Sequence, residues 1–308
     1  MLGIDWGTSN LRAMRYDANG RVLETRERPW GIRRLPEGGF QAALTDIAAG
    51  WPKAYMIACG MVGSRQGWRE VAYVDAPAGI ASLRAGVMKL DTADGRALSI
   101  VPGVRDGVGP DVMRGEETQV FGALAGHPEL AARAQLILPG THSKWVDVVD
   151  GRITHFRTVM TGELYAVLSQ HSILAASLPA AVTEGVGDAF EAGVRAARES
   201  GGGGALTRLF SVRVLQLEAR LAPAEVPGYL SGLLIGEEWR ALLASGWLRS
   251  DAPLVLVGDA AQCNRYRRAA VAFDLDPPRS VADASAAGLW RIGAAMAVRD
   301  HAITLEST

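Results

Sequence analysis

Short runs of apolar residues open the chain, and each run is bounded by polar residues or glycine. Leu2 to Asp5, Leu11 to Tyr16 and Val22 to Thr25 are three such runs. Their length predicts β-strands, and Asn19-Gly20 predicts a type I′ hairpin turn between the second and third, because both residues tolerate a positive φ. The sequence therefore predicts three consecutive strands at its start.

The same order of parts returns in the middle of the chain. The apolar run 136–138 leads to Pro139-Gly140-Thr141, a strand follows from Trp145 to Val149, and Asp150-Gly151 turns the chain into a strand from Arg152 to Val159. A repeated order in two halves predicts a duplicated architecture. We expect two domains that face each other across one ligand.

Polar loops join the first two strands of each copy. The first loop is Gly7-Thr8-Ser9-Asn10, and the second is Gly140-Thr141-His142-Ser143-Lys144. Backbone amides, hydroxyls and a side-chain amide at such a turn suit phosphate oxygens, while the alternative is an ordinary hairpin turn. Lys144 has the alternative of a solvated strand edge. Asp5 ends the first strand directly before its loop, where a carboxylate suits Mg²⁺.

Apolar periodicity predicts helices and strands in alternation over the rest of the chain. We expect helices over residues 40–49, 80–88, 112–124, 164–171, 188–200, 206–221, 229–239 and 282–298. Further strands are expected over residues 53–58, 71–74, 99–101 and 254–257, and residues 201–204 are expected to form an exposed connection. This alternation indicates an α/β fold.

Acidic residues crowd the start of the helix predicted over 112–124. Asp111 is expected to cap that helix by accepting its unpaired N–H groups. Transfer of a phosphoryl group to an alcohol needs a carboxylate in reach of the hydroxyl proton, and Asp111, Glu116 and Glu117 are all candidates. We would test Asp111 first. Acidic residues that only stabilise the helix start are the alternative.

Glycines mark two further candidate ligand sites. Gly232 and Gly236 lie four residues apart on one face of the helix 229–239, where the missing side chains admit another helix or a flat ring. Helix packing is the alternative there. Gly258 follows the buried strand 254–257, and the loop after residue 58 carries glycines, a serine and Arg65. Ligands in open α/β sheets bind outside the carboxyl ends of strands, so both loops are candidates.

Composition narrows the classes of partner. The 308 residues suffice for two domains, and a net charge of −1 with 21% charged residues gives no basic surface for nucleic acid. Two cysteines are too few for a disulfide framework, and the five histidines have no metal-binding spacing. No apolar run approaches the roughly 20 residues of a membrane span. We expect a cytoplasmic chain without membrane partners, and oligomeric state stays open, with a homodimer as one alternative.

Four motifs carry a resemblance to known families. Residues 5–12 resemble the first phosphate motif of the actin, hexokinase and heat-shock ATPase superfamily. Met113 to Gln119, Gly140 to Trp145 and Met160 to Leu164 resemble more narrowly the 2-dehydro-3-deoxygalactonokinase family, in the same order from residue 2 to about residue 297. The resemblance implies a duplicated actin-like ATPase (ribonuclease H-like) α/β fold, with a nucleotide cleft between domain 1–125, joined by helix 285–308, and domain 126–284.

The activity implied by this resemblance is ATP- and Mg²⁺-dependent phosphorylation of 2-dehydro-3-deoxy-D-galactonate at its 6-hydroxyl, a step of galactonate catabolism. A kinase for the gluconate epimer or for another sugar acid is an open alternative. A polyphosphate or nucleotide hydrolase is another, because exopolyphosphatases of the superfamily have a sequence similar to Gly115-Glu116-Glu117.

The resemblance also implies which residues hold each ligand. The nucleotide would lie near Asp5, Gly7, Thr8, Ser9, Asn10, Gly140, Thr141, His142, Ser143, Lys144, Gly232, Gly236 and Gly258, with Asp5 as the metal ligand. The sugar acid would lie near Arg12, Gly60, Met61, Ser64, Arg65 and Arg114. Arg65 in particular would grip its carboxylate, because arginine binds that group bidentately.

Overall fold

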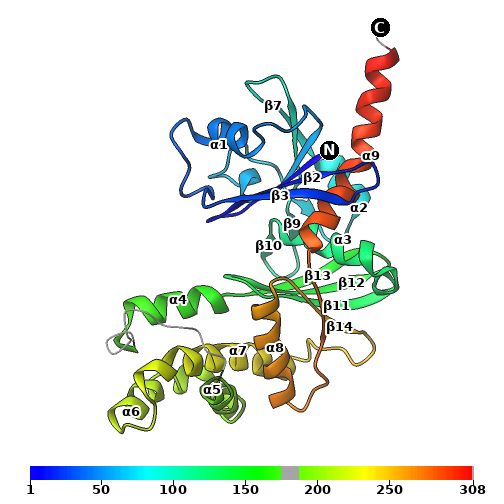
Figure 1. Cartoon of the computed structure of the whole chain (residues 1–308). Coiled ribbons are helices and arrows are strands. Elements are labelled where there is room, and N and C mark those ends of the chain that lie inside the picture. Colours follow the sequence, from blue (N-terminus) through cyan, green and yellow to red (C-terminus); the bar gives the residue numbers. More distant parts are fainter. Residues whose placement is uncertain (175–186, 307–308) are drawn as a thin grey trace. The chain divides into compact units, whose positions relative to one another are not determined.

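The structure of the protein is a computed structural model that describes residues 1–174 and 187–306 (Figure 1). The chain forms two compact units. Met1–Ala134, Val146–Arg157 and Asp283–Thr308 make up the first, and Gln135–Trp145 with Thr158–Ala282 make up the second. Strands and helices alternate along the described chain, which confirms the predicted α/β class.

The first unit contains a six-stranded sheet in the order β3-β2-β1-β4-β8-β7. Its strands are β1 (Leu2–Trp6), β2 (Leu11–Tyr16), β3 (Val22–Arg28), β4 (Met56–Gly60), β7 (Met88–Asp91) and β8 (Ala97–Ile100). β1 pairs antiparallel with β2 and parallel with β4, so that Trp6 lies opposite Gly60. The crossover through α1 (Gly39–Ile47) therefore brings the loops after β1 and β4 to the same edge of the sheet.

The turn between β2 and β3 is not the predicted type I′ turn. Gly20 has a positive φ of 87°, but Asn19 does not. Instead, the Asp17 carboxylate accepts the N–H groups of Asn19 at 2.8 Å and Arg21 at 2.9 Å, and the Asp17 N–H donates to the Arg21 carbonyl at 2.9 Å. The second predicted hairpin turn is confirmed, because Asp150 and Gly151 have φ values of 49° and 66°.

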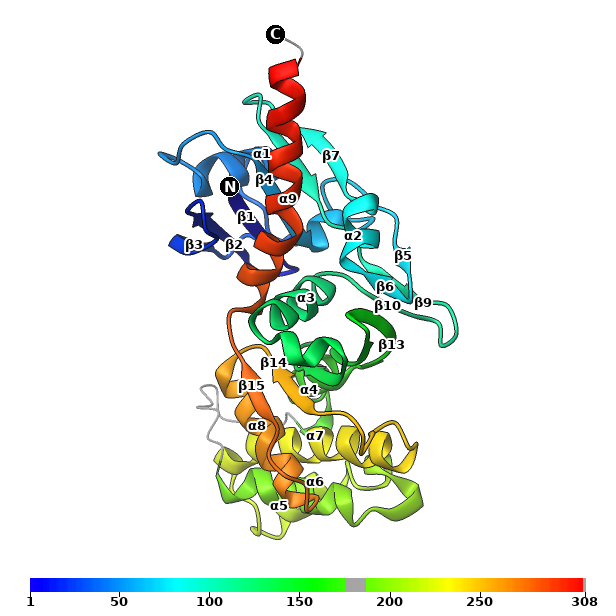
Figure 2. The same ribbon diagram turned by 90° about the vertical axis from the view of Figure 1, so that its right-hand side faces the viewer.

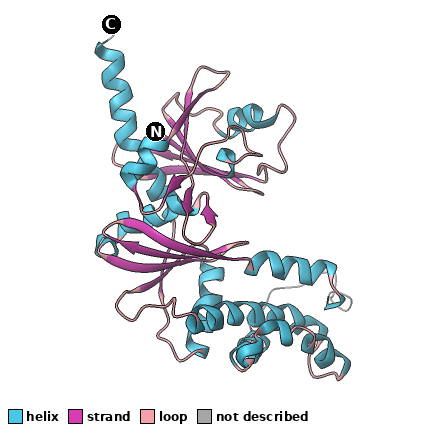
Figure 3. Cartoon of the chain, turned by 180° about the vertical axis from the view of Figure 1, so that it is seen from behind, coloured by secondary structure: helices cyan, strands magenta, loops and turns pink. Residues whose placement is uncertain are grey.

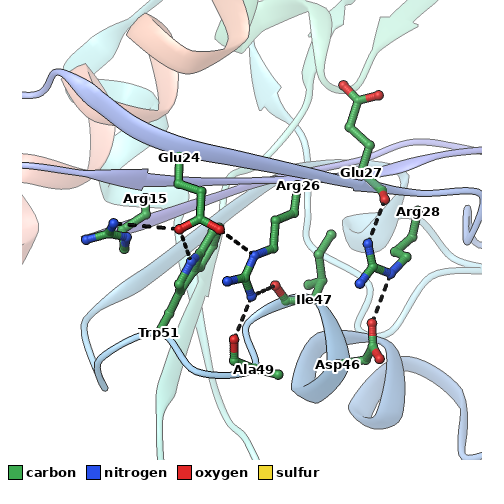
Figure 4. Close-up of polar contacts among 9 residues, drawn as sticks. All are labelled: Arg15, Glu24, Arg26, Glu27, Arg28, Asp46, Ile47, Ala49 and Trp51. Carbon is green, nitrogen blue, oxygen red and sulfur yellow. Dashed lines mark hydrogen bonds and ion pairs between the residues drawn. The ribbon is translucent and has the colours of Figure 1, made fainter.

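The edge strand β3 is covered by the carboxyl end of α1 (Figure 4). Arg26 donates to the carbonyl oxygens of Ile47 at 3.1 Å and Ala49 at 2.6 Å, and its guanidinium stacks on Trp51. Glu24 accepts from Trp51 Nε1 and from Arg26 Nε, both at 2.8 Å. Arg26 thus supplies donors to carbonyl groups at the end of the helix. The charged side chains of this edge strand also disfavour pairing with a strand of another molecule.

The helix predicted over 112–124 begins four residues later. β10 (Asp111–Met113) joins β9 (Val104–Asp106) and β5 (Val74–Asp75) in a small sheet, and α3 (Glu116–Gly126) starts after Gly115, whose φ is 109°. The Asp111 carboxylate accepts the N–H of Val112 at 2.8 Å. The prediction that Asp111 caps this helix is therefore wrong, because residues 111–113 pair as a strand.

Helices α3 and α9 (Ala284–Glu306) cross with their backbones almost in contact (Figure 2). A Cβ placed at Gly122 would lie 1.8 Å from the carbonyl oxygen of Ala284, and one at Gly288 would lie 1.9 Å from that of Thr118. Only glycine fits at either position, so this pair of glycines sets how closely α9 packs on α3.

The remaining six-stranded sheet has the order β15-β14-β11-β12-β13-β6. Its strands are β6 (Ala78–Gly79), which precedes α2 (Ile80–Gly86), then β11 (Arg133–Leu138), β12 (Ser143–Val149), β13 (Arg152–Val159), β14 (Leu254–Val257) and β15 (Arg279–Val281). β14 runs parallel to both β11 and β15. This parallel pairing confirms the buried strand predicted over 254–257.

The second unit is rich in helices, drawn in cyan in Figure 3. They are α4 (Thr161–His171), α5 (Asp188–Arg198), α6 (Ser211–Leu217), α7 (Val226–Ala244) and α8 (Ala260–Ala272). The helix predicted over 206–221 is shorter, because a separate 3₁₀ turn covers Ala205–Thr207 and Ala219 has a positive φ of 53°. No helix in the described ranges is long and apolar enough to cross a membrane.

Replacing Gly122 by Ala should destabilise the first unit. The new methyl group would meet the Ala284 carbonyl in a packed crossing, and such overpacking typically costs about 1–3 kcal/mol. Gly126→Ala is the matched control, because it lies in the same helix and no atom lies within 4 Å of its Cβ position. We expect a lower midpoint of thermal unfolding for G122A alone. Equal midpoints for the two variants would contradict the close crossing.

Candidate functional site

The loop Gly7–Asn10 is held in place through its carbonyl groups. Gly7, Thr8 and Ser9 accept N–H groups from Ile32, Arg33 and Gly31 at 3.1, 3.3 and 2.9 Å. A Cβ at Gly31 would lie 2.1 Å from the Thr8 oxygen, so only glycine permits this contact. Among the described residues, the N–H groups of Thr8, Ser9 and Asn10 have no protein acceptor. The loop therefore offers three free amide donors, as an anion site requires.

Asp5 lies beside Arg12 across the β1–β2 pair. The two residues are direct partners in register, and Arg12 Nη2 lies 3.4 Å from Asp5 Oδ2. Both side chains are partly exposed. In the described part of the chain, no three acidic, histidine or cysteine side chains gather as a metal cage. A single carboxylate next to a loop with free amide donors fits Mg²⁺, which keeps several waters and takes phosphate oxygens as ligands.

The loop after β4 exposes one arginine and buries another beneath it. Arg65 is exposed, whereas Ser64 is buried. Arg114 is also buried: its Nη2 donates to the Val71 carbonyl at 2.7 Å, and its guanidinium stacks on Tyr73. A Cβ at Gly63 would lie 3.0 Å from Arg114 Nη1, which places Arg114 directly under the loop. Of these three predicted substrate residues, the structure presents only Arg65 to solvent.

Two carboxylates meet at the amino terminus of α3. Glu117 is fully buried and accepts the Gly115 N–H at 2.6 Å and the Thr118 hydroxyl at 2.8 Å. Burial, followed by the nearby charge of Glu116, raises the pKa of Glu117 to about 7. Glu116 is only half-buried and accepts the Arg114 N–H at 3.0 Å. When Glu117 is protonated, the like charge beside Glu116 disappears.

This pair lies at the edge where β1 and β4 end. A Cβ at Gly115 would lie 3.2 Å from the Cα of Gly60, the last residue of β4. The start of α3 is thus in contact with the loop that carries Arg65. Of the two carboxylates, Glu116 is the one whose side chain reaches solvent and can touch a ligand.

In the second unit, the loop between β11 and β12 leans on the first turn of α4. The Glu163 N–H donates to the Thr141 carbonyl at 2.9 Å, and a Cβ at Gly162 would lie 2.5 Å from the Gly140 oxygen. His142 is exposed and pairs with the Glu163 carboxylate. Glycine at position 162 is what lets the loop and the helix start meet.

A pocket opens beside this contact. It encloses roughly 570 Å³ of empty space, a volume that includes the part open to solvent. Its lining residues come from the loop, α4, α7 and α8: Gly140, Thr141, Thr161, Gly162, Tyr165, Ser231, Leu234, Ile235, Gln262, Arg265 and Tyr266. Most of the side chains in this lining are polar, Leu234 and Ile235 add an apolar patch, and a glycine loop forms one edge. Such a combination suits a nucleoside phosphate.

Two of the predicted loop residues point into the protein instead. Ser143 is fully buried and donates its hydroxyl to Glu238 at 2.6 Å. Lys144 is also buried, with Nζ 3.1 Å from the His142 carbonyl. The structure therefore brings Gly140 and Thr141 to the pocket but leaves Ser143 and Lys144 in the interior. Neither is exposed to a phosphate group.

Gly232 and Gly236 face α5 rather than the pocket. A Cβ at Gly232 would lie 1.9 Å from the Phe190 oxygen, and one at Gly236 would lie 2.8 Å from the Ala197 Cβ. Helix packing is thus the correct interpretation of their spacing, and the residues of α7 that line the pocket are others. Gly258, with φ of 147°, directly follows β14, and the nearest atom to its Cβ position is 3.9 Å away.

Most of the pocket wall was not predicted from the sequence. Gln262, Arg265 and Tyr266 lie on one face of α8 at the i, i+3, i+4 spacing of a helix. Asp259 starts that helix by accepting the N–H groups of Ala261 at 2.9 Å and Gln262 at 3.1 Å. The spacing was visible in the sequence, but it is equally typical of any exposed helix face.

Known proteins resemble this chain over nearly its full length. The model of the 2-keto-3-deoxy-galactonokinase family matches residues 5–292. A protein of Rhizobium meliloti (strain 1021), described as a probable 2-dehydro-3-deoxygalactonokinase, is 40% identical over 273 residues, 86% of this chain and 87% of that protein. The 2-dehydro-3-deoxygalactonokinase of Escherichia coli (strain K12) is 36% identical over 301 residues, 96% of this chain and 98% of that one.

Solved structures of other proteins are also similar to this chain. A crystal structure from Sinorhizobium meliloti, assigned to the same activity, has a TM-score of 0.86 and 38% identity and covers 96% of this chain and 98% of its own. The activator of a 2-hydroxyisocaproyl-CoA dehydratase from Clostridium difficile, solved with bound ADPNP, has a TM-score of 0.52 at 12% identity and covers 100% of this chain and 97% of its own. The second likeness concerns the fold alone, and it confirms the predicted actin-like ATPase fold.

The raised pKa of Glu117 predicts a pH-dependent stability. Its pKa is about 7 in the folded protein against 4.5 in a free side chain, so the folded state keeps a proton that the unfolded state releases. The stability present below pH 4.5 is therefore lost as the pH rises to about 7, by up to about 3 kcal/mol.

Glu117→Gln removes this titration. We expect the difference in unfolding free energy between wild type and E117Q, measured by urea denaturation, to shift in favour of E117Q across that pH range and to stay constant above it. Parallel pH curves for the two proteins would show that Glu117 does not titrate there.

Proposed function

The chain belongs to the 2-keto-3-deoxy-galactonokinase family, and from this membership we propose how its residues transfer the γ-phosphoryl group of ATP to the 6-hydroxyl of 2-dehydro-3-deoxy-D-galactonate. The observation that carries the proposal is the carboxylate pair at the start of α3. It lies in contact with the end of β4, next to a loop with an exposed arginine. The arginine can bind the carboxylate of a sugar acid, and a carboxylate at the start of α3 can accept the proton of the hydroxyl that is phosphorylated.

The adenosine part of ATP occupies the pocket of the second unit. Leu234 and Ile235 provide an apolar wall, and Gln262 offers hydrogen-bonding groups. The phosphates extend along the Gly140-Thr141 turn at the edge of that pocket. The free amides of Thr8 and Ser9 form a second phosphate site in the first unit.

Asp5 would hold Mg²⁺, an ion that also takes phosphate oxygens and water as ligands. When bound, the ion neutralises charge that develops on the transferred phosphoryl group. Arg12 is paired with Asp5, and its guanidinium therefore fixes the direction of that carboxylate. This contact makes Arg12 a support for Asp5 rather than a substrate ligand.

The sugar acid binds at the loop after β4, with its carboxylate on Arg65. Arg65 is exposed, and a guanidinium forms two parallel hydrogen bonds with a carboxylate. Arg114 supports the loop from beneath through its contact with Val71. The 6-hydroxyl then lies at the start of α3.

Glu116 accepts the proton of the 6-hydroxyl. Its carboxylate is within reach of solvent, whereas Glu117 is sealed in the interior and Asp111 lies on a strand outside the helix. Burial raises the pKa of Glu117 to about 7, so this side chain keeps a proton to a higher pH than an ordinary carboxyl group does. We thus revise the order of candidates, from Asp111 first to Glu116 first.

Coupled ADP release tests the proposed reaction. We expect turnover with 2-dehydro-3-deoxy-D-galactonate, much less with the gluconate epimer, and almost none with ATP alone. Discrimination between epimers requires a single polar group that pairs with one hydroxyl. Rapid phosphate release without any sugar acid would instead favour a hydrolase, and equal rates with both epimers would contradict the substrate assignment.

Replacing Glu116 by Gln should lower kcat by about a hundredfold or more, because a general base typically contributes at least that factor. ATP binding, measured by calorimetry, should be unchanged, since the adenosine pocket lies in the other unit. Asp111→Asn is the control and should keep near-normal turnover. A larger loss in D111N than in E116Q would return the role to Asp111.

A further inference from the structure

One carboxylate is buried in the second unit without a basic partner. Glu238 on α7 is 1% exposed, and among the described residues no arginine, lysine or histidine forms a hydrogen bond or an ion pair with it. A buried charge of this kind is costly unless other groups hydrogen-bond it fully. Burial raises the pKa of Glu238, and four hydrogen bonds act in the opposite direction.

Each oxygen of this carboxylate accepts two hydrogen bonds. Oε1 accepts from the Ser143 hydroxyl at 2.6 Å and from Trp145 Nε1 at 2.5 Å. Oε2 accepts from the Tyr266 hydroxyl at 2.6 Å and from the Thr161 hydroxyl. Glu238 thereby ties α7 to three other elements, namely β12, α4 and α8.

The two pairs of donors differ in their relation to the pocket. Thr161 and Tyr266, which are bonded to Oε2, both line it. Ser143 and Trp145, which are bonded to Oε1, are buried in β12 and do not line it. The carboxylate therefore joins the strand that follows the Gly140-Thr141 turn to two side chains of the pocket wall.

Stability alone is a weak reason for such an arrangement. An apolar side chain of similar size usually fills a buried site at less cost than a carboxylate does. A carboxylate, unlike an apolar group, fixes the direction of its donors: the hydroxyls of Thr161 and Tyr266 point at Oε2, so these two hydroxyl groups are not turned toward the pocket. The start of α4 and the inner face of α8 are fixed in the same way.

We propose that Glu238 is a positioning residue for the nucleotide: its Oε2 fixes Thr161 and Tyr266 on the pocket wall, and its Oε1 anchors them to β12. The proposal rests on the assignment of this pocket to ATP under "Proposed function". Glu238 itself touches no ligand. It acts by holding the pocket in its binding shape before ATP arrives, which reduces the cost of ordering the site.

Glu238→Gln is a directed test, because the new amide group has only one favourable orientation. Trp145 Nε1 can only donate, so the amide oxygen must replace Oε1. The amide nitrogen then faces Thr161 and Tyr266, whose hydroxyls lose their acceptor. The substitution therefore disturbs the pocket side of the network and keeps the strand side.

We expect E238Q to raise the Kd for an ATP analogue and the KM for ATP by about tenfold, as the loss of roughly 1.4 kcal/mol of binding would. The kcat at saturating ATP should stay within about threefold of wild type. Glu237→Gln is the matched control, because Glu237 is the next residue of α7 and bonds Arg240 instead. Glu237→Gln should leave the Kd for the ATP analogue and the KM for ATP unchanged.

A double variant supplies a readout that a merely structural role would not give. In E238Q/W145F the indole N–H of Trp145 is absent, so the glutamine amide can rotate by about 180°. Its nitrogen then faces Ser143 and its oxygen faces Thr161 and Tyr266. We expect this double variant to recover part of the ATP affinity lost in E238Q. The single variant W145F should lose thermal stability but keep the KM for ATP.

The outcomes separate the two proposals. Wild type that fails to bind the ATP analogue would overturn the proposed function. Wild type that binds while E238Q binds equally well would overturn the role of Glu238, as would a double variant weaker than E238Q. If E238Q does not fold, Tyr266→Phe removes one donor from Oε2, and an unchanged KM for ATP in Y266F would overturn the role as well.

Discussion

Burying a carboxylate without a cation is the constraint on which both units depend. Glu117 in the first unit and Glu238 in the second are each almost fully buried, and no basic side chain among the described residues forms a hydrogen bond or an ion pair with either. Such groups are tolerated only where hydrogen-bond donors converge on them. At Glu117 the donors are the Gly115 N–H and the Thr118 hydroxyl at a helix amino terminus, and at Glu238 they are four side chains. These hydrogen-bond donors are held in fixed positions by the buried carboxyl groups. The same residues shape the candidate site.

Local patterns in the sequence sufficed for the strands and hairpins but not for the direction of individual side chains. Ser143 was predicted to face a phosphate because it follows Gly140-Thr141 in a polar loop. In the structure β12 begins at Ser143, two residues before the predicted strand, so Ser143 and Trp145 point to the same side of the strand and both reach Glu238. A shift of two residues at a strand boundary turned an apparent ligand into a core residue.

The pocket was missed for a different reason. Its wall combines the turn at residue 140 with side chains near residues 161, 231 and 265, and no local pattern can indicate that these segments meet. The start of α3 was misplaced because residues 111–113 are compatible with a helix and with a strand, and pairing with β9 decides between them. Long-range pairing is the information that a single sequence lacks.

Glycines connect the packing of the helices to the positions of these carboxylates. Gly122 and Gly288 let α3 and α9 cross at backbone contact, and Gly193 with Gly232 does the same for α5 and α7. A helix held so closely along its length cannot slide, because any shift drives backbone atoms into one another. α3 carries Glu116 and Glu117 at its start, and α7 carries Glu238 six residues beyond Gly232. The close helix crossings that stabilise each unit therefore also fix the position of its buried carboxyl group. A substitution at one of these glycines would displace the helix and the carboxyl group that it carries.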